Sequence, residues 1–409
     1  MRKKLQAACI VVGMSILLTG CAFQETSSEQ ETYGKENNVV DINSTTEGKA
    51  ENAVTSSSAF SDIPEFSGEL DFEYVYGTDA QTEIGSYAAC VYTEDGKYFA
   101  EMLDDYSGSR LLFYDNASGQ TVPVCSKSNC AHNAEGCDAF FAEEIYFSPI
   151  TMWYYEDNLY MPMLDGDYIY LEKISPDGST REKAGTICRM ETEITINEDG
   201  SQYSRRRWPG GQLHRGYFYF TTFIPGDESI NLYRVKLGSN EEPEVLYTLN
   251  GNEPWLLRIK PYGRYVLFQI TTLNNETQTY DGTICAYDTD TGSISRLCDN
   301  VIREFIVMQN CLYYCDTKDN VYCKDLDTKN TSLFYETNED MDLYSVEMFS
   351  TEDGLVYQLT NVAFGAVEKQ YVLSLDGTVK KQIVVDIDTE DVEEQKKELV
   401  RPYSFVGTK

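Results

Sequence analysis

The chain has 409 residues, and its 67 acidic side chains outnumber the 33 basic ones to give a formal net charge of −34. An acidic surface of this size disfavours DNA, RNA and anionic lipid as partners of the folded body, because each of them is negatively charged. We therefore expect no nucleic-acid partner.

The first twenty residues have the order of a bacterial export signal. A basic stretch at residues 2–4 precedes a short apolar run at residues 7–18, which ends in Leu18-Thr19-Gly20-Cys21. This run falls below the roughly 20 residues needed to span a bilayer, so residues 1–20 are predicted to be a signal peptide. Its end resembles the lipobox of bacterial lipoproteins, which implies diacylation of Cys21 and anchoring at the extracytoplasmic face of the cell membrane. The alternative is an ordinary secretory signal in which Cys21 is incidental.

Residues 21–64 are expected to be the lipidated cysteine followed by a disordered linker. From Ala22 to about Asp62 the chain is rich in Glu, Ser, Thr, Asn and Gln, and its apolar residues are scattered. Such a composition cannot bury enough apolar surface to offset the entropy lost on ordering. The folded body is therefore assigned to residues 65–409, held near the membrane by a flexible tether.

A turn-and-strand pattern recurs six times in this body. Each copy places Gly or Asn, which accept positive φ, just before an aromatic or β-branched run. The turn residues are spaced 62, 58, 47, 47 and 44 residues apart, and they are Gly96, Asn158, Gly216, Gly263, Asn310 and Gly354. A second hairpin follows in each unit, and repeats of this length are typical of propeller blades. We predict an all-β fold, a β-propeller of six four-stranded blades, or of seven if residues 143–211 contain another.

The C-terminal stretch breaks the strand pattern. Residues 388–399 begin with a helix-capping sequence and carry charge pairs four residues apart, which predicts a short surface helix. Residues 401–406 then resemble a strand. We expect this strand to close the ring by pairing with the first blade, because an open edge strand would be prone to aggregation.

One segment between the first and second predicted blades concentrates metal-binding side chains. Cys125, Cys130, His132 and Cys137 place three thiols and one imidazole within thirteen residues. Four nitrogen and sulfur ligands suit a closed tetrahedral zinc site, although the Cys-x4-Cys-x-His-x4-Cys spacing is unusual. The alternatives are a disulfide in an exported loop, with one cysteine left over, or free thiols. Zinc or a disulfide would act as a structural clip on a long loop that runs to about Ile145.

Taken together, these features resemble a group of β-propeller lipoproteins from Gram-positive anaerobes. The residues that carry the resemblance are the lipobox ending in Cys21, the six turn-and-strand repeats, and the segment from Cys125 to Cys137. The resemblance implies the propeller fold and a lipid-anchored location. It brings no activity that transfers residue by residue.

A second candidate site is the basic cluster of the acidic body. It consists of Arg205, Arg206, Arg207 and Trp208. Arginine beside tryptophan could hold a carboxylate or the face of a sugar, so the cluster is a candidate ligand-binding site. The alternative is that these arginines pair with neighbouring carboxylates.

The sequence favours a cell-surface lipoprotein whose propeller binds a glycan, peptide or protein ligand without catalysing a reaction. It has no Gly-x-Ser-x-Gly elbow, phosphate loop or dinucleotide fingerprint. Only His132 and His214 could serve in a histidine triad. The alternative is an extracellular glycan-processing enzyme that uses carboxylates in the propeller channel, because 67 acidic residues offer many pairs.

Overall fold

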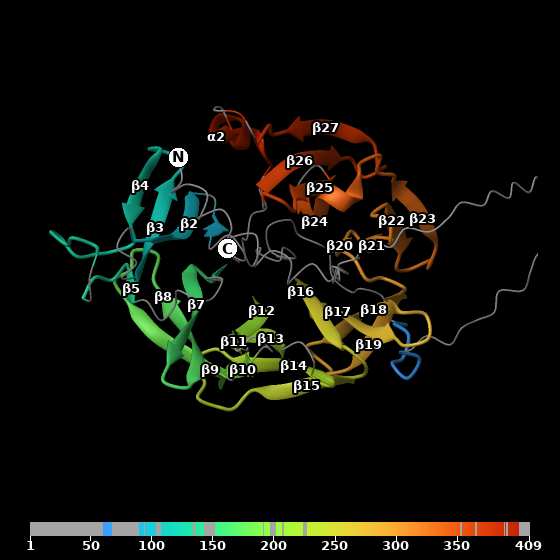
Figure 1. Ribbon diagram of the computed structural model, residues 1–409, viewed down its shortest axis with the longest axis horizontal. Helices are drawn as coiled ribbons and strands as arrows, with labels where there is room; N and C mark the ends of the chain where they lie inside the picture. Colours follow the sequence, from blue (N-terminus) through green and yellow to red (C-terminus); the bar gives the residue numbers. More distant parts are fainter. Residues whose placement is uncertain are drawn as a thin grey trace, which may run out of the picture.

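The protein folds into a ring of six β-sheets (Figure 1). The computed structural model describes residues 60–67, 90–93, 95–103, 108–133, 136–142, 152–190, 192–196, 202–206, 208–223, 227–351, 354–364, 366–387, 389 and 392–400. Helical structure in these ranges consists of η2 (Met341–Leu343), α2 (Val392–Gln395) and η3 (Lys396–Glu398). No helix in this part of the chain is long and apolar enough to cross a membrane. The predicted all-β propeller with six blades is confirmed.

Each blade is an antiparallel sheet whose first four strands follow chain order, with the first strand innermost in the ring (Figure 1). Blade 1 has a fifth strand, which pairs with its third. Blade 1 comprises β1 (Cys90–Tyr92), β2 (Gly96–Met102), β3 (Gly108–Asp115), β4 (Gln120–Pro123) and β5 (Phe140–Ala142). Blade 2 comprises β6 (Trp153–Tyr155), β7 (Asn158–Asp165), β8 (Tyr168–Ile174) and β9 (Arg181–Arg189). Blade 3 comprises β12 (Trp208–His214), β13 (Tyr217–Phe223), β14 (Ser229–Lys236) and β15 (Glu244–Asn250). Blade 4 comprises β16 (Trp255–Tyr262), β17 (Tyr265–Asn274), β18 (Thr279–Asp288) and β19 (Ile294–Asp299). Blade 5 comprises β20 (Phe305–Met308), β21 (Cys311–Cys315), β22 (Val321–Asp325) and β23 (Thr331–Tyr335). Blade 6 comprises β24 (Tyr344–Thr351), β25 (Gly354–Asn361), β26 (Ala366–Leu373) and β27 (Val379–Val384).

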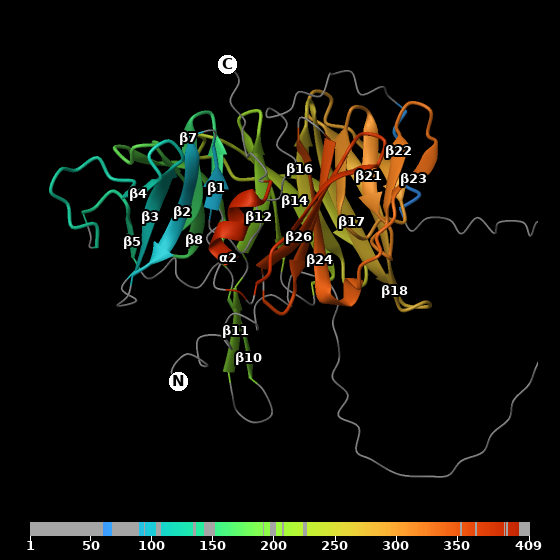
Figure 2. The same ribbon diagram turned by 90° about the horizontal axis from the view of Figure 1, so that it is seen from above.

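The region that could have contained a seventh blade forms other structures. Its described residues make up blade 2, the start of β12, and a separate two-stranded hairpin of β10 (Thr192–Ile196) and β11 (Gln202–Arg206). This hairpin projects from one end of the ring (Figure 2). The blade count is therefore six.

Four of the six repeated turn residues have the predicted positive φ, whereas Gly96 and Asn158 do not. Gly354 has φ of 146°, and a Cβ added there would lie 2.0 Å from the carbonyl oxygen of Leu373. Asn310 lies in the left-handed region with φ of 60°. In the second repeat the positive φ falls on Glu156 and Asp157, just before Asn158. The position of the turn is thus more regular than the residue type that makes it.

Shared apolar cores hold neighbouring blades together. Five buried clusters join the blades in chain order, from blades 1 and 2 to blades 5 and 6. Between blades 4 and 5, for example, Leu267 belongs to the same cluster as Phe305 and Leu312. Within the described ranges, no shared cluster joins blade 6 to blade 1.

The chain's own C-terminal segment covers part of blade 6. Val400 packs against a small buried cluster of Phe349, Val356 and Val372. The buried Gln370 side chain donates a hydrogen bond to the Val400 carbonyl at 2.8 Å and accepts one from its N–H at 2.9 Å. The surface helix predicted over 388–399 is found as α2 and η3. The closing strand predicted over 401–406 lies outside the described residues.

An N-terminal segment, residues 60–67, crosses the outer edge of blade 4, and we call it the strap. Phe60 and Ile63 belong to the core between blades 3 and 4, and Phe66 belongs to the core between blades 4 and 5. Arg296 of β19 holds the strap in two ways. Its backbone carbonyl accepts a hydrogen bond from Phe66 N–H at 2.9 Å, and its guanidinium donates to the Phe60 carbonyl at 3.4 Å.

The strap changes the boundary expected for the linker. Residues 60–64 were assigned to the disordered linker, yet Phe60 is 4% exposed and Ile63 is 6% exposed. Amino-acid composition is averaged over a long stretch of chain, whereas two buried side chains are enough to hold a short segment in place. The packed chain therefore includes residues 60–67.

A buried histidine connects blade 3 to blade 4. His214 of β12 donates its Nε2 proton to the Gly263 carbonyl at 2.6 Å, in the turn between β16 and β17. Burial lowers the pKa of His214 from its ordinary 6.5 to about 4. The imidazole is therefore neutral near pH 7.

We expect Phe60→Ala to lower the free energy of unfolding by about 3 kcal/mol, the low end for a buried phenylalanine, because other contacts still hold the strap. Phe364→Ala is the matched control, because Phe364 is 59% exposed. The free energy of unfolding of Phe364→Ala should fall by less than about 0.5 kcal/mol. Urea unfolding measures both variants. Equal losses would contradict the role given to the strap.

Protonation of His214 should make stability depend on pH. Below about pH 6.5 the unfolded chain binds a proton that the folded chain accepts only near pH 4. The stability linked to His214 is therefore complete above about pH 6.5 and is lost progressively toward pH 4, by about 3 kcal/mol in total. His214→Gln can still donate a hydrogen bond and does not titrate, so it should flatten this part of the curve. Urea denaturation between pH 7 and pH 4 measures the free energy of unfolding of both proteins. An equal decrease in the parent and the variant would refute the assignment.

Candidate metal centre

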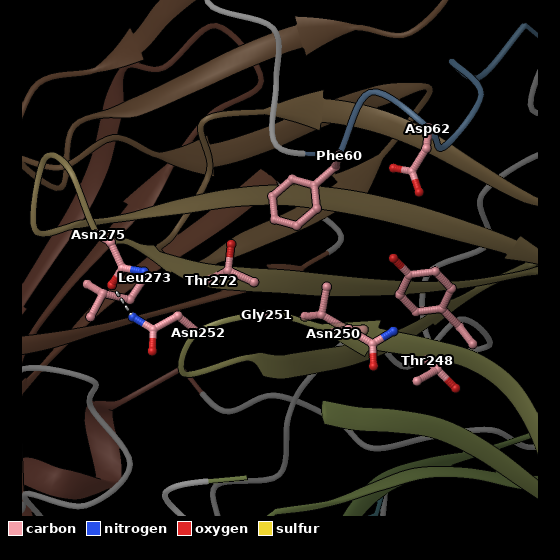
Figure 3. Close-up of a pocket in the computed structure, with 11 residues that line it drawn as sticks. Phe60, Asp62, Thr248, Asn250, Gly251, Asn252, Thr272, Leu273 and Asn275 are labelled. Atoms are coloured by element: carbon pink, nitrogen blue, oxygen red, sulfur yellow. Dashed lines mark hydrogen bonds between the residues drawn. The ribbon is translucent and has the colours of Figure 1, made fainter. Parts of the chain in front are cut away.

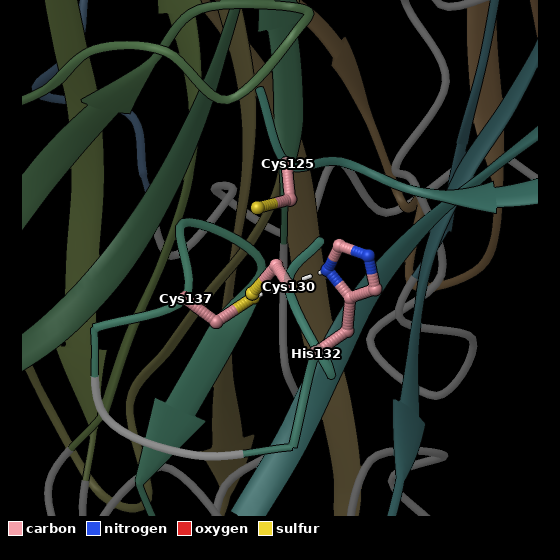
Figure 4. A group of neighbouring side chains, drawn as sticks. All are labelled: Cys125, Cys130, His132 and Cys137. Atoms are coloured by element: carbon pink, nitrogen blue, oxygen red, sulfur yellow. Dashed lines mark hydrogen bonds between the residues drawn. The ribbon is translucent and has the colours of Figure 1, made fainter. Parts of the chain in front are cut away.

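The four predicted metal ligands come together at the edge of blade 1 (Figure 4). One donor atom from each of Cys125, Cys130, His132 and Cys137 lies within 4.8 Å of every other. The Cys137 Sγ to His132 Nδ1 distance is 3.5 Å. A tetrahedral zinc ion with Zn–S bonds of about 2.3 Å would space its ligands by about 3.8 Å. The cluster is thus close to the size that a zinc ion requires.

The local chain forms this cluster through tight turns. Asn129 and His132 have φ of 62° and 57°, and Gly136 has φ of 90°. Positive φ is uncommon for residues other than glycine. These reversals fold the segment between Cys125 and Cys137 back on itself.

The loop leaves and rejoins the same sheet. β4 pairs with one half of β3, and β5 pairs with the other half. Two short strands therefore share the outer edge of blade 1, and the metal-binding loop connects them. The strand pattern was expected to resume only near Ile145, so β5 at Phe140–Ala142 is a difference from the prediction.

Polar groups surround the cluster and contact its ligands. The Ala139 N–H donates to Cys137 Sγ at 3.3 Å. Lys127 Nζ lies 2.7 Å from an Asp138 carboxylate oxygen, and this contact lowers the pKa of Asp138. Outer-shell hydrogen bonds of this kind orient ligands and tune a metal site.

Burial and hydrogen bonding act in opposite directions on the thiols. Burial raises the pKa of Cys137 to about 11. Burial also opposes ionisation of Cys125, but hydrogen bonds from the backbone of Lys127 and Asp138 outweigh it and lower its pKa. The cluster thus combines one buried thiol with one that ionises more readily.

The loop is also fastened to blade 2. Arg181 of β9 donates to the backbone carbonyls of Asp138 and Phe140, at 3.2 and 3.1 Å, and pairs with Glu172 at 2.6 Å. Gly178, in the β8–β9 turn, approaches so closely that a Cβ there would lie 2.2 Å from the Val124 carbonyl oxygen. The cluster therefore lies at the junction of two blades, and sequence reasoning missed these supports.

The arrangement has the chemistry of a structural site. All four donors come from one loop and can complete a tetrahedron without water or substrate, whereas a catalytic zinc keeps an open position. A disulfide would need only two of the thiols and would not require the His132 ring to turn toward them. In the structure all three cysteines are free thiols, and this convergence could bind a metal such as zinc.

The other predicted site residues that the structure describes belong to two different strands. Arg205 and Arg206 lie in β11 of the projecting hairpin, while Trp208 begins β12 of blade 3. Arg207 and Cys21 lie outside the described residues.

A buried charged network was not foreseen from the sequence. Lys260, which is 1% exposed, pairs with Glu304, and Arg258 binds the other oxygen of the same carboxylate at 3.1 Å. Arg258 has φ of 49°, beside a bulge in β16. Burial alone would raise the pKa of Glu304, but Lys260 and Arg258 outweigh burial and lower it. The network joins the innermost strand of blade 4 to the start of blade 5.

Comparison with known proteins identifies no family. No protein-family model matches the sequence, and no curated protein matches it either. Similar solved structures include TolB from Acinetobacter baumannii, with 12% identity, a TM-score of 0.33 and coverage of 66% of this chain and 64% of TolB. BamB from Moraxella catarrhalis has 10% identity and a TM-score of 0.34, and the match covers 73% of this chain and 87% of BamB. The computationally designed Ika8 protein has 9% identity and a TM-score of 0.39, and the match covers 76% of this chain and 90% of Ika8. At these identities the likeness does not extend to function.

Replacing His132 with alanine should weaken zinc binding by at least about tenfold, because one of four ligands is lost. His214→Gln is the matched control, since it alters a histidine far from the cluster and should keep the metal. Metal analysis of protein purified without chelator gives the zinc content per chain. Unchanged zinc in His132→Ala, or a metal-free protein with a mass two protons lighter, would contradict the prediction.

Proposed function

We propose that this protein is a lipid-anchored, extracytoplasmic binding protein whose propeller presents a ligand site without catalysing a reaction. The lipobox-like end of the signal at Cys21 supports the anchor, since acyl chains attached there would hold the protein at a membrane. Propellers commonly carry ligand sites on a rigid ring. The partner would be a glycan, a peptide or a protein, and the acidic surface disfavours nucleic acid.

The observation that carries this proposal is the strap. The segment that arrives from the expected tether is fastened to blades 3, 4 and 5 by Phe60, Ile63 and Phe66. A pull on the tether would therefore act on three buried side chains and on the Arg296 contacts, and would not act directly on β1. A chain fastened in this way suits a domain that is held at a surface.

We assign zinc to the Cys125–Cys137 cluster as a structural clip. Its four donors are of the types that zinc prefers, and the described residues of their loop between β4 and β5 form no strand. Zinc binding would contribute to folding at this edge, since a metal site is formed only in the folded chain.

The alternative, a glycan-processing enzyme, would need two carboxylates with separated pKa values beside a substrate. Glu304 and Asp319 have shifted pKa values in opposite directions, because Lys260 and Arg258 lower that of Glu304 while burial raises that of Asp319. Both side chains are buried, however, and each contacts an arginine or a lysine. Their contacts account for both carboxylates, and nothing in the described part of the chain favours this alternative. Release of a product from any polysaccharide by the purified protein would overturn the binding role.

Replacing Cys21 with serine should release the protein from membranes into the soluble fraction, because the lipid would have no attachment point. Cys188→Ser is the matched control and should stay with the membranes, since Cys188 belongs to β9 of the folded ring. Fractionation of cells followed by immunoblotting measures both. A Cys21→Ser protein that still sediments with membranes would disprove the lipid anchor.

A further inference from the structure

A polar groove lies beside the strap, where blades 3 and 4 meet (Figure 3). Its volume is about 390 Å³, within the range of small-molecule binding sites. The strap contributes Phe60 and Asp62 to one wall. The end of β15 with the turn that follows it, and the end of β17 with its turn, supply the rest. The groove is therefore complete only when the strap is in place.

The lining is rich in neutral polar side chains. The amides are Asn250, Asn252 and Asn275, and the hydroxyls are Thr248 and Thr272. Among the described residues of the lining, Asp62 is the one carboxylate, and there is no lysine, arginine or histidine. Without a cation the groove has nothing to neutralise a phosphate, a sulfate or a uronate.

Two asparagines from separate turns form a paired surface. The Asn252 Nδ2 amide donates to Asn275 Oδ1 at 2.7 Å (Figure 3). Each amide group has two donor hydrogens and an acceptor oxygen. The pair therefore still offers an acceptor on Asn252 and a donor on Asn275. An acceptor beside a donor matches two neighbouring hydroxyl groups, each of which can donate and accept.

One aromatic side chain gives the groove an apolar surface. The Tyr247 ring lines it and packs against Phe268 with the ring centroids 6.0 Å apart. Burial raises the pKa of Tyr247 to about 12, so its hydroxyl stays protonated. Phe60 and Leu249 are buried in the core and add little free apolar surface. The lining is therefore mostly polar, which suits a ligand rich in hydroxyl groups.

We propose that this groove binds a neutral saccharide chain, an inference that rests on the proposed binding role. Amides and hydroxyls bind the sugar hydroxyls, and the Tyr247 ring contacts the C–H groups of a pyranose. Anionic polysaccharides are excluded by Asp62 and by the net charge of −34. The ligand site is thus formed by two blades and by the segment that connects the ring to its anchor.

Calorimetric titration of the full-length protein with neutral tetrasaccharides tests the proposal. The probes are cellotetraose, xylotetraose, mannotetraose and tetra-N-acetylchitotetraose, with tetragalacturonate as the anionic probe. We expect at least one neutral probe to bind and the anionic probe to fail. Asn252→Ala and Asn275→Ala should each weaken binding by about three- to tenfold, as the loss of one or two hydrogen bonds predicts. Asn330→Ala, an exposed asparagine in the β22–β23 turn of blade 5, should leave binding unchanged.

Three results would overturn the proposal. Neutral binding that neither groove variant weakens, while both variants melt like the parent, would place the site elsewhere and leave the binding role intact. Stronger binding of tetragalacturonate than of every neutral probe would reject the neutral class. If no saccharide binds, the groove proposal fails, and the binding role then depends on whether a defined peptide or protein partner is found. Hydrolysis of a probe during titration would reject the binding role itself.

Discussion

The structure depends on one constraint, which is that every blade has two apolar faces and cannot cover either of them alone. Side chains of a strand alternate between the two faces of its sheet, so a single four-stranded blade would leave both faces in water. Five shared cores satisfy this constraint between consecutive blades. The two ends of the described chain serve the same purpose, since Val400 covers an apolar cluster of blade 6 and the strap covers the rim of blade 4. Blades, strap and C-terminal segment therefore depend on one another.

The architecture could be predicted from the sequence because its signals are local and repeated. A turn residue before an alternating strand needs only a few neighbours, so Gly216 and Gly354 could be recognised without knowing what the blade touches. The strap could not be found in this way. Phe60 is one apolar residue in a polar stretch, and its partners lie more than 150 residues away in blades 3 and 4. The same reason hides the contact between Arg258 and Glu304, which are 46 residues apart and rely on a bulge in β16.

The ligands of the candidate metal centre could be predicted from the sequence, whereas the residues that support it could not. The four donors fall within thirteen residues, so their chemistry shows in the sequence. Arg181, which fixes the loop to blade 2, lies 43 residues from Asp138 in the chain and resembles any other arginine of a strand. The groove between blades 3 and 4 was hidden for a similar reason, because its walls come from three separate stretches and its asparagines also look like ordinary turn residues.

The divided outer edge of blade 1 also has a consequence for how such a protein can change over evolution or by engineering. Because β4 and β5 each pair independently with β3, the connection between them can lengthen or shorten without shifting the register of the ladder. The entropic cost of a longer connection rises only slowly, by about 0.6 kcal/mol for each doubling of its length. A small folded module or a peptide epitope could be inserted between His132 and Cys137 at little cost to the ring, because all four ligands would be kept. A tag at this site would report on the clip, since its ends stay close only while the cysteines and His132 are held together.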